Sequence, residues 1–181
     1  MSQTLSTQGT NHPDMEDTEI AHLAGFIDAV GSVTVHVSKN DSYKLGYNYT
    51  PVVRASRPMN DNDPLLGKLL EYADEQGVRY SLSEKSHAKD RDSMSYEFFC
   101  KRPDGVKRFL EPLLPYLVAK YEPALILLEH VIPRIEDGLH LEKEGFYELM
   151  EFADAIRQND RQKSIKKYDQ KYFANEWSIT Q

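Results

Sequence analysis

The segment LAGFIDAVG, residues 23–31, constrains the fold of this 181-residue chain more than any other feature. Its apolar residues recur at helical spacing, which predicts a helix with one buried face. Glycine inside a helix costs about 1 kcal/mol relative to alanine, so Gly25 requires a reason. The close approach of a second helix backbone is such a reason. Gly31, just past the helix, can take a left-handed conformation and turn the chain directly into a strand.

The pattern changes after Gly31 from a period of 3.6 to a period of 2. This change predicts a strand with Val33, Val35 and Val37 on its buried face. Further elements are predicted as a strand over 43–56, a helix over 63–77, strands around 79–84 and 94–102, and helices over about 103–114, 120–135 and 142–158. The order predicts an α+β domain with its helices on one face of an antiparallel sheet.

Composition divides the chain into four parts. We expect a disordered N-terminal arm over 1–16, a main domain over 17–136, a C-terminal helix of the same domain over 137–160, and a polar, locally basic tail over 161–181. The sequence contains no internal repeat, and in particular no second copy of the 23–31 segment.

Composition also indicates a cytoplasmic protein. The single cysteine, Cys100, excludes an internal disulfide and suits a reducing compartment. No apolar stretch approaches the ~18 to 20 residues that a membrane-spanning helix needs, and the N-terminus has no signal-peptide pattern. The formal net charge of −7 is unfavourable for binding phosphates. A local basic face can nevertheless coexist with an acidic remainder.

The segment 23–31 resembles the LAGLIDADG motif, and the predicted element order resembles the αββαββα core of the single-motif LAGLIDADG homing endonucleases. The stretch LPYLVAK, residues 114–120, leading into an apolar helix, is also similar to that family. The resemblance covers Ile20 to Ile135. It implies a saddle-shaped antiparallel sheet that lies in the major groove of double-stranded DNA, here followed by extra C-terminal helices. One motif per chain implies a homodimer whose two motif helices pack together, and a palindromic or near-palindromic target.

The chain departs from the family pattern at the eighth motif position. The resemblance implies a metal-binding acid there, and this sequence has Val30. Phosphodiester hydrolysis of this kind needs Mg²⁺, and hard divalent cations need oxygen ligands, so we expect endonuclease activity to be impaired. Asp28 and the carbonyl of Ala29 are the remaining candidate metal ligands. Without catalysis we expect no cofactor.

The resemblance and the strand alternation together predict the remaining site residues. The candidate catalytic residues are Lys120, which matches the family's active-site lysine, and Arg57, which follows the second strand. Short polar side chains and an arginine on the outward strand face are suited to reading base edges. The candidate DNA-binding residues are Thr34, His36, Ser38, Asn40, Asn48, Thr50 and Arg54. The candidate dimer interface consists of Leu23, Ala24, Gly25, Ile27 and Asp28.

Three functions are compatible with these features. The first is a homing endonuclease, or a direct descendant, that binds long double-stranded DNA as a homodimer. The second is a DNA-binding regulator that kept the scaffold and lost cleavage. The third is a maturase that binds intron RNA on the same scaffold. Val30 favours the second and third over an efficient nuclease.

Overall fold

A computed structural model describes residues 17–58, 63–87, 90–158 and 167–179. The first part comprises α1 (Asp17–Val30), β1 (Gly31–Lys39), β2 (Tyr47–Pro58), α2 (Pro64–Glu75), β3 (Ser81–His87) and β4 (Asp90–Cys100). The second part comprises α3 (Pro103–Leu110), η1 (Leu114–Tyr116), α4 (Tyr121–Ile126), the π-helical turn η2 (Leu127–Val131), α5 (Ile132–Glu136), η3 (Leu139–Leu141), α6 (Lys143–Gln158) and α7 (Gln170–Trp177). The arm expected over 1–16 lies outside the described residues.

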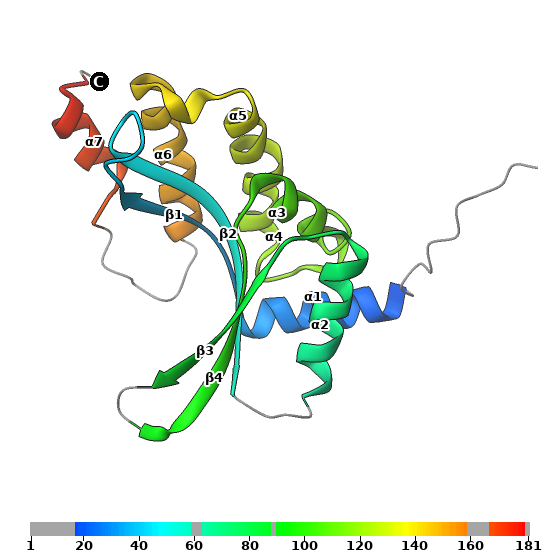
Figure 1. Cartoon of the computed structure of the whole chain (residues 1–181). Coiled ribbons are helices and arrows are strands. Elements are labelled where there is room, and N and C mark those ends of the chain that lie inside the picture. The colour runs from blue at the N-terminus through cyan, green and yellow to red at the C-terminus, as the bar shows by residue number, and fades with distance from the viewer. Residues whose placement is uncertain (1–16, 59–62, 88–89, 159–166, 180–181) are drawn as a thin grey trace, which may run out of the picture.

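The four strands form one antiparallel sheet in the order β1-β2-β4-β3. The sheet is strongly curved, and the β3–β4 hairpin extends away from the helices (Figure 1). Helices α1 to α5 lie on one side of the sheet, and within the described residues its other face is uncovered (Figure 1). The α+β architecture predicted from the sequence is therefore confirmed.

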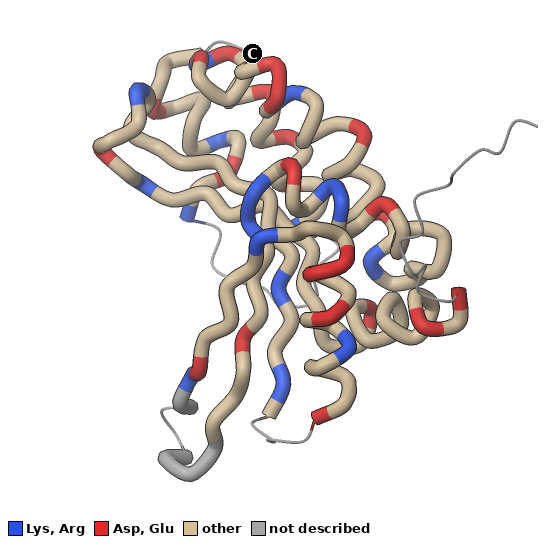
Figure 2. The backbone as a smooth tube through the Cα atoms, turned by 45° about the vertical axis from the view of Figure 1, so that its right-hand side comes forward, with Lys and Arg blue, Asp and Glu red and all other residues tan. Residues whose placement is uncertain are grey.

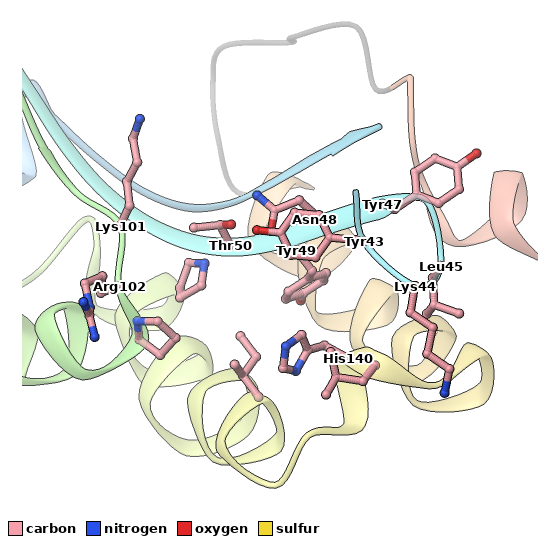
Figure 3. A pocket seen from close by; sticks show the side chains of 14 residues that line it. Tyr43, Lys44, Leu45, Tyr47, Asn48, Tyr49, Thr50, Lys101, Arg102 and His140 are labelled. Atoms are coloured by element: carbon pink, nitrogen blue, oxygen red, sulfur yellow. The ribbon is translucent and has the colours of Figure 1, made fainter. Parts of the chain in front are cut away.

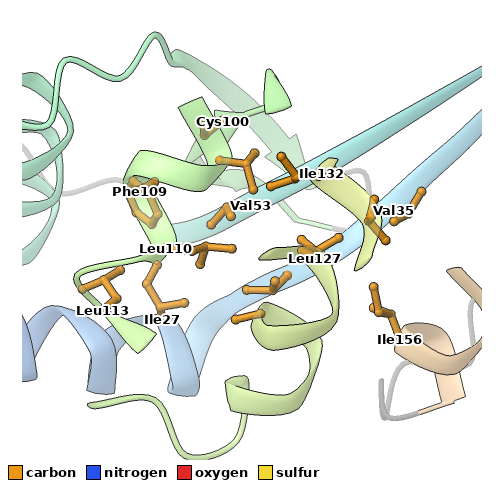
Figure 4. Packing of buried hydrophobic residues seen from close by; sticks show 14 of the residues in the cluster. Ile27, Val35, Val53, Cys100, Phe109, Leu110, Leu113, Leu127, Ile132 and Ile156 are labelled. Carbon is orange, nitrogen blue, oxygen red and sulfur yellow. The ribbon is translucent and has the colours of Figure 1, made fainter. Parts of the chain in front are cut away.

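The core lies between the sheet and the helices. The side chains of Val33, Val35 and Val37 are buried, whereas those of Thr34 and His36 are not, so the predicted alternation of β1 is confirmed. Fully buried residues from α1, β2, α3 and the η2–α5 segment pack together in this layer (Figure 4). Burying such apolar surface provides the main driving force for folding.

Gly31 permits the direct passage from α1 into β1 for a different reason from the one expected. A Cβ atom there would lie 2.5 Å from the carbonyl oxygen of Ile27, which no side chain tolerates. Its backbone is not left-handed, since the glycines with positive φ are Gly46, Gly77 and Gly138. Close contact with the preceding helical turn therefore requires glycine at this position.

Helix α2 begins as the sequence predicts. The Asp63 side chain accepts hydrogen bonds from the amides of Leu65 and Leu66, and Pro64 occupies the first turn. Arg57 donates from Nε to Asp63 at 2.8 Å. This hydrogen bond is the main cause that lowers the pKa of the Asp63 carboxyl, although burial opposes it.

We expect Asp63→Ala to lower the free energy of unfolding by about 1–2 kcal/mol at neutral pH, because the helix loses its N-cap. Since the folded-state pKa is depressed, the carboxylate contributes stability above its unfolded-state pKa of about 3.9 and loses it as pH falls below that value. Urea denaturation at pH 7 and pH 3 should show the difference between wild type and variant shrinking at pH 3. Asp63→Asn, which keeps a capping oxygen, is the control, and a loss as large as that of alanine would contradict the capping role.

The residues after 160 differ from the tail that the sequence predicts. Helix α7 packs against the domain, and Phe173 is fully buried. The ring of Phe173 lies 4.9 Å from that of Tyr47 and 5.0 Å from that of Phe146. The polar-tail prediction is therefore wrong for residues 170–177, because the aromatic residues are spaced to share one helix face. Residues 161–166 lie outside the described part of the chain.

Candidate nucleic-acid interface

The uncovered face of the sheet carries most of the side chains predicted to read DNA. The β1–β2 register sets His36 opposite Thr50 and Ser38 opposite Asn48. Directly opposite residues of an antiparallel pair project to the same face. Thr34 and Arg54 lie on this face as well, because they alternate with the buried Val33, Val35, Val53 and Ala55. The structure therefore brings these six residues together on one surface.

Asn40 does not belong to that surface row. It follows the last residue of β1, and its side-chain oxygen accepts hydrogen bonds from the backbone amide and the hydroxyl of Ser42. Its backbone amide also donates to the carbonyl of Gly46. Asn40 thus shapes the turn between β1 and β2, and the assignment to the strand face is wrong because the strand ends at Lys39.

The charge of the uncovered face differs from that of the whole chain. Acidic residues lie mainly on the helices and loops (Figure 2). The uncovered face contributes Arg54 and Lys85 from the strands, and Lys101 follows β4. Lys101 lies over the ring of Phe99 at 4.5 Å and points away from the helices (Figure 3). The net charge of −7 is therefore compatible with phosphate contacts on this side.

Asp28 lies near the C-terminal end of α1, which we call the foot of the helix, and its side chain binds the loop before α4. One of its carboxylate oxygens accepts from the amide of Val118 at 2.7 Å, and the other accepts from the amide of Lys120 at 2.8 Å. Lys120 is the N-cap residue of α4. Asp28 therefore attaches the loop before α4 to the end of the motif helix. This contact places the backbone of Lys120, a predicted catalytic residue, beside the C-terminal end of the motif helix.

Two exposed apolar side chains lie at this foot. Val30, the last residue of α1, is 39% exposed, and Val118 is 84% exposed. Neither offers an oxygen to a metal ion. Among the described residues, no group of three histidine, cysteine, aspartate or glutamate side chains is placed to hold a metal. Since both oxygens of Asp28 already accept hydrogen bonds from backbone amides, no set of side chains in the described part of one chain fits a divalent metal centre.

Arg57 lies on the helix side of β2, away from the uncovered face. Besides its ion pair with Asp63, its guanidinium lies 5.7 Å from the ring centroid of Phe26 in α1. These contacts tie β2 to α2 and α1. The structure therefore gives Arg57 contacts that position these elements, and its predicted catalytic role stays a prediction.

The exposed side of α1 differs from the predicted interface. Leu23, Ala24 and Ile27 are at most 1% exposed and belong to the chain's own core, so their assignment to a dimer interface is wrong. The helical period turns these three inward and leaves Gly25 exposed. A Cβ atom at Gly25 would meet nothing within 4 Å, so no contact within the chain requires glycine there.

Sequence reasoning missed a cavity of about 230 Å³ beside β2. It is lined by the turn before β2, by the junction from β4 to α3 and by the segment around η3, with Asn48, Thr50 and His140 among its residues (Figure 3). The Nδ1 atom of His140 is buried without a hydrogen-bond partner, and burial lowers the pKa of this histidine. No local pattern could have indicated the cavity, because its walls come from distant parts of the chain.

An αββαββα unit with a glycine-containing helix at the foot of an open, curved sheet is the LAGLIDADG class of fold. The model of the LAGLIDADG endonuclease family matches residues 23–118, more than half of the chain. The chain therefore belongs to the LAGLIDADG endonuclease family. A comparison with curated proteins found no match.

Solved structures of homing endonucleases share the fold. I-CvuI in complex with a DNA target in the presence of magnesium has a TM-score of 0.70 at 20% identity, over 91% of this chain and 98% of that one. The archaeal intron-encoded I-Vdi141I, complexed with DNA, has a TM-score of 0.67 at 19% identity, over 92% and 100%. I-TnaI has a TM-score of 0.57 at 22% identity, over 81% and 96%.

None of the described helices is both long and apolar enough to cross a membrane.

Proposed function

We propose that this chain binds double-stranded DNA as a homodimer through the uncovered face of its sheet, and that it cuts DNA poorly or not at all. The observation that carries the proposal is Val30. Asp28, near the end of the motif helix, binds the backbone amides of Val118 and Lys120, yet an exposed valine stands where the resemblance places a metal-binding acid. The scaffold is therefore retained without its main metal ligand.

Three features support DNA as the partner. The uncovered face presents hydroxyl, amide and imidazole groups beside Arg54. These groups can form hydrogen bonds with base edges and phosphates. The acidic residues that produce the net charge lie mainly elsewhere (Figure 2). Two of the similar structures, I-CvuI and I-Vdi141I, contain DNA.

The homodimer is supported by Gly25. A helix-interior glycine is costly, and no neighbour within the chain explains it. A second copy of α1 packed against this side would explain it, because two helix backbones approach closely only across small residues. Two-fold symmetry of the pair would then present two equivalent sheets to two half-sites of the DNA.

The test is selection of bound sequences from a random duplex library, followed by gel shift and cleavage assays with Mg²⁺ on the selected site. We expect the selected site to be near-palindromic and the affinity for it to fall as the salt concentration rises. We expect no detectable cleavage under conditions in which an active homing endonuclease cuts all of its substrate. Intron RNA bound in preference to duplex DNA would overturn the proposal in favour of a maturase. Efficient cleavage by the wild type would overturn the proposal that Val30 impairs catalysis.

We expect Gly25→Leu to abolish the dimer while the fold is kept or gains about 1 kcal/mol, since leucine is a better helix former and has room within the chain. Gel filtration at micromolar concentration should show a dimer for wild type and a monomer for the variant, with similar circular dichroism. Gly67→Leu is the matched control, because Gly67 is an exposed glycine inside α2 with nothing within 4 Å of its Cβ position. A dimer that survives Gly25→Leu would contradict this interface.

A further inference from the structure

Glu97 is an acidic side chain on the face that we propose for DNA. Phe98, the next residue of β4, and Cys100, two residues further on, are both fully buried in the core. Glu97 therefore projects to the opposite side, which is the uncovered face. Among the strand residues whose side chains the structure describes, Glu97 is the only acidic residue on this face.

The surroundings of Glu97 are polar but weakly basic. Its register partners are Ser56 in β2 and Ser83 in β3, so a hydroxyl-bearing residue lies on each side of it. Lys85 donates to one carboxylate oxygen at 3.3 Å, and the lysine side chain is 53% exposed. Glu97 itself is only 9% exposed. An ion pair with an exposed lysine contributes little to stability, so it does not account for a carboxylate at this position.

A carboxylate at the centre of this face restricts what can lie against it. It repels phosphate groups, and it only accepts hydrogen bonds. In the major groove, guanine presents acceptors at O6 and N7, and thymine presents an acceptor at O4. Cytosine presents only the N4 amino donor, and adenine presents its N6 donor beside the N7 acceptor. Cytosine is therefore the base whose edge complements a carboxylate without any opposed acceptor.

We propose that Glu97 is a specificity-determining residue that selects cytosine at one base pair in each half-site of the DNA. The proposal rests on the proposed function and adds to it the base that one side chain reads. The Glu97 carboxylate acts partly by repulsion, because guanine and thymine would place a hydrogen-bond acceptor against this buried negative charge. The preference appears at two positions related by the two-fold axis of the dimer.

The test compares the sequence preferences of wild type and Glu97→Gln by selection from a random duplex library without added metal. A glutamine both donates and accepts, and it suits adenine N6 and N7. We expect one symmetric pair of positions to change from cytosine to adenine, with a change in relative affinity of roughly tenfold. Glu84→Gln is the matched control, because it removes the same charge from β3 on the other side of the sheet, opposite Tyr96.

Each outcome separates this inference from the proposed function. If wild type selects no duplex sequence, the proposed function fails. If wild type selects a site that Glu97→Gln leaves unchanged, only the role of Glu97 fails. If Glu97→Gln binds all sequences more tightly without changing the preference, the carboxylate acts by general repulsion of phosphate, and base selection is overturned. A preference change also produced by Glu84→Gln would overturn it as well.

Discussion

Val30→Asp is expected to produce Mg²⁺-dependent strand cleavage in a protein that we propose binds DNA without cutting it. The change restores a carboxylate at the eighth position of the motif, and carboxylate oxygens are the ligands that Mg²⁺ takes in proteins. Because the Val30 side chain is 39% exposed, aspartate fits there without opening a cavity. A carboxylate at the C-terminal end of α1 opposes the helix dipole, so we expect a stability loss of only about 0.3–1 kcal/mol.

The measurement is single-turnover cleavage of the site selected by wild type, with and without Mg²⁺. We expect the rate to rise by orders of magnitude, since metal ions both activate water and stabilise the leaving oxygen. Val30→Asn is the matched control, because it has the shape of aspartate without the charge, and it should stay close to wild type. Equal rates for wild type and Val30→Asp would show that Val30 does not limit the chemistry.

Phe173→Ala is expected to lower the free energy of unfolding by about 3–5 kcal/mol, the usual loss when a fully buried phenylalanine is truncated. Phe173 is 0% exposed and contacts the rings of Tyr47, Phe146 and Trp177. Two of these partners belong to β2 and α6, so the truncation opens a cavity between α7 and the domain. The whole domain should lose stability, because α7 covers part of its core.

Urea denaturation followed by fluorescence and by circular dichroism measures this loss. Lys171→Ala is the matched control, since Lys171 is an exposed residue of the same helix and should change stability by less than about 0.5 kcal/mol. A loss below 1 kcal/mol for Phe173→Ala would indicate that α7 detaches without affecting the rest of the domain, and that its packing is not part of the cooperative fold.

Local patterns were sufficient for much of the fold. The alternation of Val33, Val35 and Val37 with polar residues identified both the strand and its uncovered face, because neighbouring side chains of a strand always project to opposite sides. Asp63 and Pro64 identified the start of α2, because capping depends on residues adjacent in sequence. Such features need no knowledge of distant contacts.

Other features depended on contacts across the chain. The candidate interface included Leu23 and Ile27 because they belong to a familiar motif, whereas the packing of α1 turns them into the core. Arg57 was expected after the second strand, yet it lies within β2 and its contacts with Asp63 and the ring of Phe26 come from segments that only the fold brings together. The aromatic residues of α7 looked like part of a tail until Tyr47, from a distant strand, became their neighbour.

The motif helix and its surroundings separate what the sequence determines from what the tertiary structure determines. By itself the sequence identified the family, the glycine at position 25 and the valine at position 30, because each depends on residue identity at a known place in a motif. Tertiary structure alone decided that Asp28 holds the loop before α4, that Gly25 faces outward, and that Glu97 lies between Ser56 and Ser83. Strand register and helix packing set these relations, and both follow from contacts between residues far apart in sequence.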